Sequence, residues 1–181
     1  KAASQKLEAL WNHLIKGGQA LLELGEYDFS PKYGWLQDRF GVSWQLILTE
    51  PDGDPRPTVM PSLLFVGDAC GKAEEAGNLY KSSFKNSETG MTVLFPDGVE
   101  GEREGTVMFS DFRLRDTWFT ASDSALEHNF KFNEAVSFII YCENQDEIDH
   151  FSNKLSAEAP TENERWQKDK FGIFWRVMLE E

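Results

Sequence analysis

The sequence predicts an α+β fold assembled from βαβββ modules, each a strand and a helix followed by three more strands. Three features of the chain support this prediction. A motif of two tryptophans, an aspartate, a phenylalanine and a glycine occurs twice. Segments with helical apolar spacing are followed by several short apolar runs of strand length. A stretch with three prolines and no apolar periodicity separates the first 48 residues from the rest.

The repeated motif is Trp-x-x-Asp-x-Phe-Gly-x-x-Trp, at residues 35–44 and again at residues 166–175. One offset, 166 − 35 = 131, aligns all five shared residues. In each copy the aspartate and the basic residue after it predict a polar turn, and the glycine permits a positive φ. The apolar run that follows predicts a strand. The simplest interpretation is a hairpin whose tryptophans fill a core, and the alternative is that these tryptophans line a pocket.

Residues 1–48 are expected to form one helix and three strands. The helix covers residues 1–18. A strand, a hairpin and a strand follow over residues 19–48, with a turn at residues 29–32. Because no strand precedes the helix, we interpret this segment as the αβββ remnant of a first domain. Residues 49–58 are expected to be a linker.

Residues 59–181 are expected to form one complete domain of two modules. The first module covers residues 59–123, with a strand at 59–66, a helix at 72–84, and strands at 91–95, 105–114 and 117–122. The second module covers residues 134–181 and is shorter. Its expected elements are a strand at 135–141, a helix capped by residues 144–147 and ending near Ala157, and two strands that end in the second copy of the motif.

The composition argues against several classes of function. The 181 residues carry a net charge of −13, which disfavours binding to nucleic-acid phosphates. No apolar run approaches the roughly 20 residues of a membrane span, and no signal peptide is recognisable. Cys70 and Cys142 have no metal-ligand or Cys-x-x-Cys spacing, which favours free thiols and a cytoplasmic location. Cys70 begins a predicted helix and is therefore a candidate for a lowered pKa.

Several segments resemble the PhnB-like proteins, which have been labelled 3-demethylubiquinone-9 3-methyltransferases. They are residues 64–76 with 79–80 and 84–87, residues 130–138, and the repeated motif. PhnB-like proteins belong to the vicinal oxygen chelate superfamily, with glyoxalase I, bleomycin-resistance proteins and extradiol dioxygenases. The resemblance covers nearly the whole chain. It implies paired βαβββ modules that form a cupped, mixed β-sheet around a cleft, and it implies a homodimer.

Metal enzymes of this superfamily hold their ion with four His or Glu side chains from four strands. The resemblance places these positions at Pro61, Ser137, Arg176 and Trp118 or Phe119, and the final-strand position of the first domain at Gln45. None is a good ligand, and arginine stays protonated. The sequence therefore predicts no metal and no cofactor. It does not support a methyltransferase either, because it contains no glycine-rich loop of the nucleotide-binding type.

The function that follows is a metal-free module that binds a small, flat or amphipathic molecule in an aromatic cleft. The candidate cleft residues are Phe65, Trp118, His128, Ser137, Tyr141, Trp166, Trp175 and Arg176. The simpler alternative is that most of these rings fill the core. His128 is interpreted as a loop histidine or as an acid–base group at the cleft mouth, whereas His13 and His150 are expected to be solvated.

Two further hypotheses remain open at this point. One is a metal-dependent enzyme of lyase or dioxygenase type from the same superfamily. The other concerns assembly, because the αβββ segment at residues 1–48 leaves a sheet edge and a sheet face uncovered. Two such segments complete each other across a two-fold axis, or one segment docks on the complete domain of its own chain.

Overall fold

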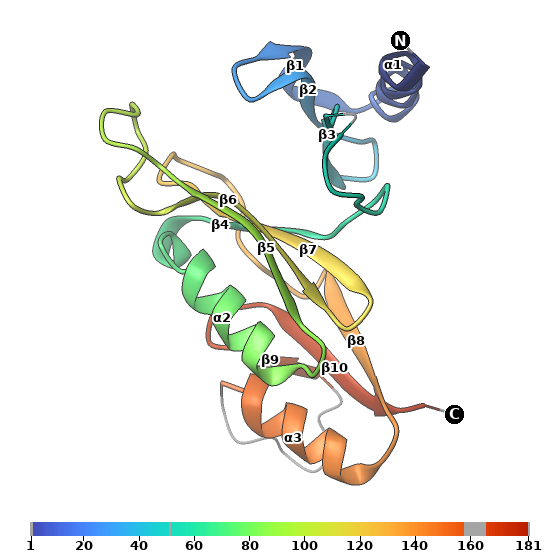
Figure 1. The fold of residues 1–181 in the computed structure, drawn as a ribbon, viewed down its shortest axis with the longest axis vertical. Coiled ribbons are helices and arrows are strands. Elements are labelled where there is room, and N and C mark those ends of the chain that lie inside the picture. The colour runs from blue at the N-terminus through green and yellow to red at the C-terminus, as the bar shows by residue number, and fades with distance from the viewer. Residues whose placement is uncertain (1, 51, 158–165, 181) are drawn as a thin grey trace. The chain divides into compact units, whose positions relative to one another are not determined.

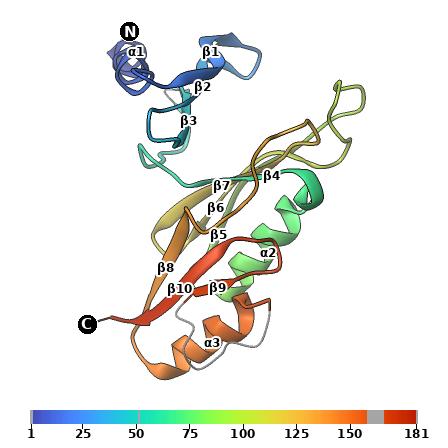
Figure 2. The ribbon, with the colours of Figure 1, turned by 180° about the vertical axis from the view of Figure 1, so that it is seen from behind.

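The computed structural model describes residues 2–50, 52–157 and 166–180 (Figure 1, and Figure 2 from behind). The chain divides into two compact units, Lys1–Pro55 and Arg56–Glu181, which we call unit 1 and unit 2. The division falls inside the segment that was expected to be a linker. None of the helices in the described residues is long and apolar enough to cross a lipid bilayer.

Unit 1 is one helix packed on an antiparallel sheet. Its elements are α1 (Ala2–Leu14), β1 (Gln19–Tyr27), β2 (Ser30–Gln37) and β3 (Ser43–Ile47), with the strands paired in the order β1-β2-β3. Trp11 of the helix is buried in one cluster with Leu36 and Leu46 of the sheet. A Cβ atom at Gly34 would lie 2.6 Å from the Trp11 ring, so this close approach requires glycine.

Two expected boundaries in unit 1 are wrong. The helix ends at Leu14, and β2 already begins at Ser30, so the turn between β1 and β2 lies earlier than residues 29–32. The Ser30 Oγ atom lies 2.9 Å from the carbonyl oxygen of Lys32 and 3.1 Å from that of Leu48, so its single proton is shared between these two acceptors. These bonds fix the start of β2 beside the end of β3, a long-range contact that local turn signals do not reveal.

The first module of unit 2 has the predicted βαβββ order. Its elements are β4 (Ser62–Phe65), the short 3₁₀ helix η1 (Gly67–Ala69), α2 (Ala73–Ser83), β5 (Glu88–Leu94), β6 (Val107–Leu114) and β7 (Thr117–Asp123). These strands form what we call the first sheet, in the order β4-β7-β6-β5, with β4 parallel to β7. The strand expected at residues 59–66 is shorter than predicted, and Pro61, directly before its observed start, has no N–H group to donate to a ladder.

Within the described residues, the second module of unit 2 follows the same order with one strand fewer. Its elements are β8 (Ser137–Cys142), α3 (Gln145–Leu155), β9 (Trp166–Lys168) and β10 (Phe174–Leu179). They form the second sheet, in the order β8-β10-β9, with β8 parallel to β10. As predicted, Asn144 caps α3 by accepting a hydrogen bond from the Glu147 N–H. The end of this helix expected near Ala157 falls at Leu155, and residues 158–165 lie outside the described residues.

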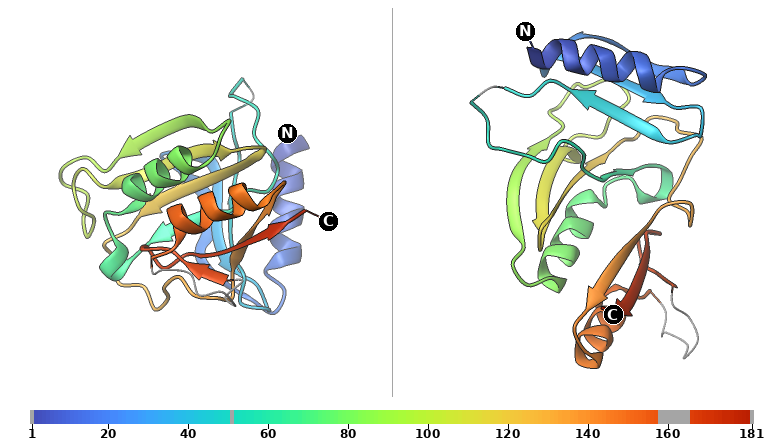
Figure 3. Two further views of the ribbon diagram at one scale, coloured as in Figure 1. Left: turned by 90° about the horizontal axis from the view of Figure 1, so that it is seen from below. Right: turned by 90° about the vertical axis from the view of Figure 1, so that its right-hand side faces the viewer.

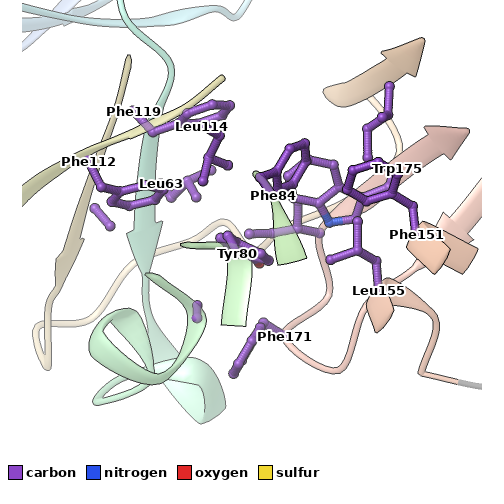
Figure 4. Packing of buried hydrophobic residues seen from close by; sticks show 14 of the residues in the cluster. Leu63, Tyr80, Phe84, Phe112, Leu114, Phe119, Phe151, Leu155, Phe171 and Trp175 are labelled. Carbon is purple, nitrogen blue, oxygen red and sulfur yellow. The ribbon is translucent and has the colours of Figure 1, made fainter. Parts of the chain in front are cut away.

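The two helices of unit 2 lie side by side and cover one face of each sheet (Figure 3). Helix α2 packs on β4, β6 and β7, whereas α3 packs on β8, β9 and β10. A single hydrophobic core joins both modules (Figure 4), and its deeply buried members include Phe65, Tyr80, Phe151, Leu155 and Trp175. The protein therefore has the predicted α+β architecture of paired βαβββ-type modules, with the opposite face of each sheet left open by the helices.

The two copies of the repeated motif form the same turn. In each copy one carboxylate oxygen of the aspartate, Asp38 or Asp169, accepts the backbone N–H groups two and four residues later, at 2.9–3.0 Å. The other oxygen accepts the indole N–H of the tryptophan six residues later, at 3.0 and 2.9 Å. Gly41 and Gly172 have φ values of 85° and 95°, which explains why the motif contains glycine.

The surroundings of the two turns differ sharply. The Asp169 carboxylate also accepts a hydrogen bond of 2.6 Å from the Tyr80 hydroxyl of α2. Burial, together with the charge of Asp169, raises the pKa of Tyr80. Phe171 is 8% exposed and contacts the rings of Phe65 and Tyr80, whereas the equivalent Phe40 is 77% exposed. The turn in unit 2 is thus part of the contact between the two modules, and the turn in unit 1 faces solvent.

We predict that Asp169→Ala destabilises the protein by about 3 kcal/mol or more, because it leaves several buried donors without an acceptor. Equilibrium urea unfolding followed by tryptophan fluorescence measures this change. Asp38→Ala is the matched control, since its turn is exposed. Hydrogen exchange should show that its effect stays within residues 1–55. Equal losses of stability from both substitutions would contradict this account of the turn.

Candidate functional site

The face of the second sheet that α3 leaves uncovered carries exposed aromatic and apolar side chains. Along β8 the residues alternate, so Ile140 and Cys142 are buried, whereas Ile139 and Tyr141 are 45% and 51% exposed. Trp166 of β9 is 47% exposed. We call this surface the open face of the second sheet, and define it by Ser137, Ile139, Tyr141, Trp166 and Arg176.

Arg176 lies in the middle of this open face, because β10 is the central strand. It pairs with Trp166 on β9 and with Ile139 on β8. Its guanidinium carbon is 5.3 Å from the centroid of the Trp166 ring. The Nε atom is buried without a hydrogen-bond partner, and within the described residues no carboxylate pairs with this side chain. Since buried donors are normally satisfied, Arg176 is the clearest chemical signal on this surface.

The structure separates the predicted cleft residues. Ser137, Tyr141, Trp166 and Arg176 belong to the open face of the second sheet. Phe65 and Trp175 belong instead to the core and are completely enclosed by neighbouring side chains. The sequence showed an alternation of two faces along each strand, but it did not show which face the helices cover.

Trp118 lies on the first sheet, under a residue that sequence analysis did not consider. The guanidinium carbon of Arg56 is 3.7 Å from the centroid of the Trp118 ring. Arg56 Nε also donates a hydrogen bond of 2.7 Å to Asp111 Oδ2, and Asp111 is buried. Both residues were missed because Arg56 falls in the expected linker and Asp111 in an otherwise unremarkable strand. The only sequence signal was a pair of prolines flanking Arg56.

His128 contacts a serine. Its Nε2 atom is 2.9 Å from Ser124 Oγ, and the Ser124 hydroxyl donates to Glu102 Oε1 at 2.8 Å. Because the single hydroxyl proton is directed at the carboxylate, His128 Nε2–H is the donor to Ser124. This arrangement, with a buried serine, is not that of a nucleophile activated by a histidine base. It instead holds the loop after β7 to the loop before β6.

His150 was expected to be solvated, and this expectation is incomplete. Its Nε2 atom lies 2.8 Å from the Ser83 carbonyl oxygen at the end of α2. Its ring packs edge-on against Phe151. The residue therefore links the two helices of unit 2.

The chain matches the protein family described as 3-demethylubiquinone-9 3-methyltransferase over residues 2–47 and 57–178. It belongs to this family. These two matched stretches correspond to the two units of the structure. No curated protein matches the sequence significantly.

One solved structure supports the same assignment, and two others follow it here for comparison of the fold. A PhnB protein from Bacillus cereus, titled a putative 3-demethylubiquinone-9 3-methyltransferase, is 32% identical with a TM-score of 0.61, and the match covers 68% of this chain and 100% of that one. A protein from Pseudomonas aeruginosa shares the fold at 20% identity, with a TM-score of 0.55 over 67% of this chain and 96% of that one. A glyoxylase/bleomycin resistance protein/dioxygenase domain from Frankia sp. EAN1pec is 13% identical, with a TM-score of 0.44 over 70% and 94%.

The residues at the metal-ligand positions that the sequence resemblance implied do not fit an ion. Ser137 and Arg176 lie on the second sheet, Trp118 lies on the first sheet beneath Arg56, and Pro61 precedes β4. A guanidinium and an indole cannot coordinate a divalent cation. Across residues 2–50, 52–157 and 166–180, no three His, Cys, Asp or Glu side chains are grouped to hold a metal.

Neither thiol of this PhnB-like chain is activated. Burial raises the pKa of Cys142 to about 11, and burial also raises the pKa of Cys70. The hypothesis of a lowered pKa at Cys70 is therefore wrong. Cys70 lies between η1 and α2, where its own N–H bonds the Gly67 carbonyl, and the nearby Asp123 carboxylate further disfavours a thiolate.

Proposed function

We propose that this PhnB-like protein binds a small, flat molecule with an anionic group on the open face of the second sheet, without a metal. The observation that carries this proposal is the Nε atom of Arg176, a buried donor with no hydrogen-bond acceptor among the described residues. A carboxylate or a similar anion would supply the missing acceptor in a charge-assisted hydrogen bond. Trp166 and Tyr141 would hold the flat body of the ligand against their exposed rings.

Because the protein has a large excess of acidic residues, an arginine whose Nε atom has no acceptor among the described residues is unexpected. The chain has 31 acidic and 18 basic residues, so acceptors for an arginine are abundant. For example, Arg113 pairs with Glu88, and Arg115 pairs with Glu147. An arginine without such a partner, beside an exposed tryptophan, is better explained by a ligand than by the packing of the sheet.

We predict that small aromatic carboxylates such as benzoate raise the melting temperature of the protein and change its tryptophan fluorescence. Arg176→Ala should weaken this binding at least about tenfold, because a charge-assisted hydrogen bond contributes about 1.5–3 kcal/mol. Isothermal titration measures the affinity. Benzyl alcohol, which has the same ring and no charge, should bind more weakly than benzoate.

Arg113→Ala is the matched control, because Arg113 lies on the first sheet and is paired with Glu88. Its affinity for benzoate should equal that of the unsubstituted protein. The proposal fails if no aromatic carboxylate binds, or if Arg176→Ala and Arg113→Ala bind equally well.

The alternative function is a metal-dependent lyase or dioxygenase-type enzyme. We predict that elemental analysis of the dialysed protein finds well under one divalent ion per chain, because the residues at the family's ligand positions are poor donors. One tightly held ion per chain would overturn the metal-free proposal and favour the enzyme. The methyltransferase named in the family description is not part of our proposal, because nothing among the described residues points to a methyl-donor site.

We further propose that two copies of the chain associate through unit 1. In unit 2 each module presents a hairpin turn to the helix of the other, through Asp169 and Tyr80 on one side and through Arg115 and Glu147 on the other. Unit 1 has the same turn, and its Phe40 is exposed. A second copy of unit 1, related by a two-fold axis, would bring a helix to each turn and bury this ring.

We predict that the protein sediments as a dimer and that Phe40→Asp shifts it toward monomer, because a charge then replaces the ring at the interface. Analytical ultracentrifugation over a range of concentrations measures the shift. Phe29→Asp is the control, since Phe29 is another exposed phenylalanine of unit 1, on the turn between β1 and β2. A monomer at high concentration, or equal effects of both substitutions, would refute this mode of association.

A further inference from the structure

On the first sheet, a buried carboxylate and an indole ring both contact the guanidinium group of Arg56. Asp111 of β6 and Trp118 of β7 lie on the face that α2 does not cover, since their neighbours Phe112 and Phe119 are buried in the core. Arg56 fills the space above them. Its guanidinium carbon is 3.7 Å from the centre of the Trp118 ring, and its Nε is 2.7 Å from Asp111 Oδ2. Stacking on an indole together with a carboxylate contact is the arrangement that suits a guanidinium group.

The sheet itself holds Asp111 in place. Its Oδ1 atom accepts the backbone N–H of Met91 at 2.5 Å, where the register of β5 against β6 shifts. A Cβ atom at Gly90 would lie only 2.0 Å from Oδ1, so the glycine makes room for the carboxylate. Because one oxygen is anchored in this way, the other oxygen remains directed at the cation. The carboxylate is therefore positioned by β5 and β6, independently of Arg56.

Arg56, in contrast, belongs to a segment without regular structure. Residues 54–61 form no helix or strand, and Arg56 stands between Pro55 and Pro57. A residue before proline is restricted to extended conformations, which limits the positions that the arginine has to sample. The guanidinium above Trp118 thus belongs to an irregular segment, residues 54–61, which we call the Arg56 strap. The two groups that contact this guanidinium, Asp111 and Trp118, belong to the sheet.

We propose that Asp111 and Trp118 form a binding site for a small molecule bearing a guanidinium group, and that Arg56 is its built-in occupant. The site is separate from the open face of the second sheet and favours the opposite charge. A ligand enters only when the Arg56 strap is displaced, so the strap acts as a tethered competitor. The geometry already shows how the ligand is held, because the arginine side chain contains the same group.

The test uses propylguanidinium as a probe on the full chain, at concentrations far below those that denature proteins. Arg56→Ala should bind propylguanidinium at least about tenfold more tightly than the unsubstituted protein, because a tethered group has a high effective concentration. Binding should raise the melting temperature of Arg56→Ala and leave that of the unsubstituted protein nearly unchanged. Arg56→Gln, which keeps much of the side-chain length without the charge, provides a second vacated site if the alanine variant folds poorly.

Two controls make the test specific. Adding Asp111→Asn to Arg56→Ala should abolish binding, although asparagine keeps an oxygen for the Met91 N–H. Propylammonium, a compact cation without a planar group, should bind Arg56→Ala more weakly than propylguanidinium. The proposal is overturned if neither Arg56 variant binds the probe, if the Asn variant binds it equally well, or if propylammonium matches it.

Discussion

The packing of the two modules of unit 2 depends on the hydrogen bonds that the buried carboxylate of Asp169 accepts. This carboxylate closes the turn between β9 and β10, orients the core indole of Trp175, and accepts a hydrogen bond from Tyr80 of the other module. One side chain therefore specifies a local turn and also fixes how two modules meet. The equivalent residue of unit 1, Asp38, closes its turn without a tyrosine partner in the described residues. Hydrogen bonds, foremost that from the Trp44 indole, lower the pKa of Asp38.

The packing that follows from this contact decides which faces are available to ligands. With α2 and α3 held side by side, the helices cover one face of each sheet and leave the other open. The first sheet has a carboxylate on its open face, and a strap residue, Arg56, covers it. The second sheet has an arginine on its open face, and the buried Nε atom of this arginine has no hydrogen-bond partner among the described residues. The two faces thus differ in charge and in occupancy, although their modules share one topology.

The sequence predicted the parts of this account that depend on local chemistry. The Asp-x-Phe-Gly-x-x-Trp spacing predicted the turn and the following strand, and apolar alternation predicted most strands. It could not place Phe65 and Trp175 correctly, because alternation defines two faces without showing which one a helix covers. It also missed Arg56 and Asp111, since a contact across 55 residues has no local signature. The repeat was nonetheless informative, because Phe171 is buried by side chains of the first module whereas the equivalent Phe40 is exposed.

On the proposed function, Arg176 receives an anionic ligand on the open face of the second sheet. The most direct test of this proposal is a ¹H–¹⁵N correlation spectrum of the arginine side chains, with the Arg176 Nε–H signal assigned by its loss in Arg176→Lys. Titration with benzoate should move this signal and leave those of Arg113 and Arg56 in place, because those side chains already have carboxylate partners. An Arg176 signal that stays still while ligand binds elsewhere, or that moves no more than the other two, would contradict the account.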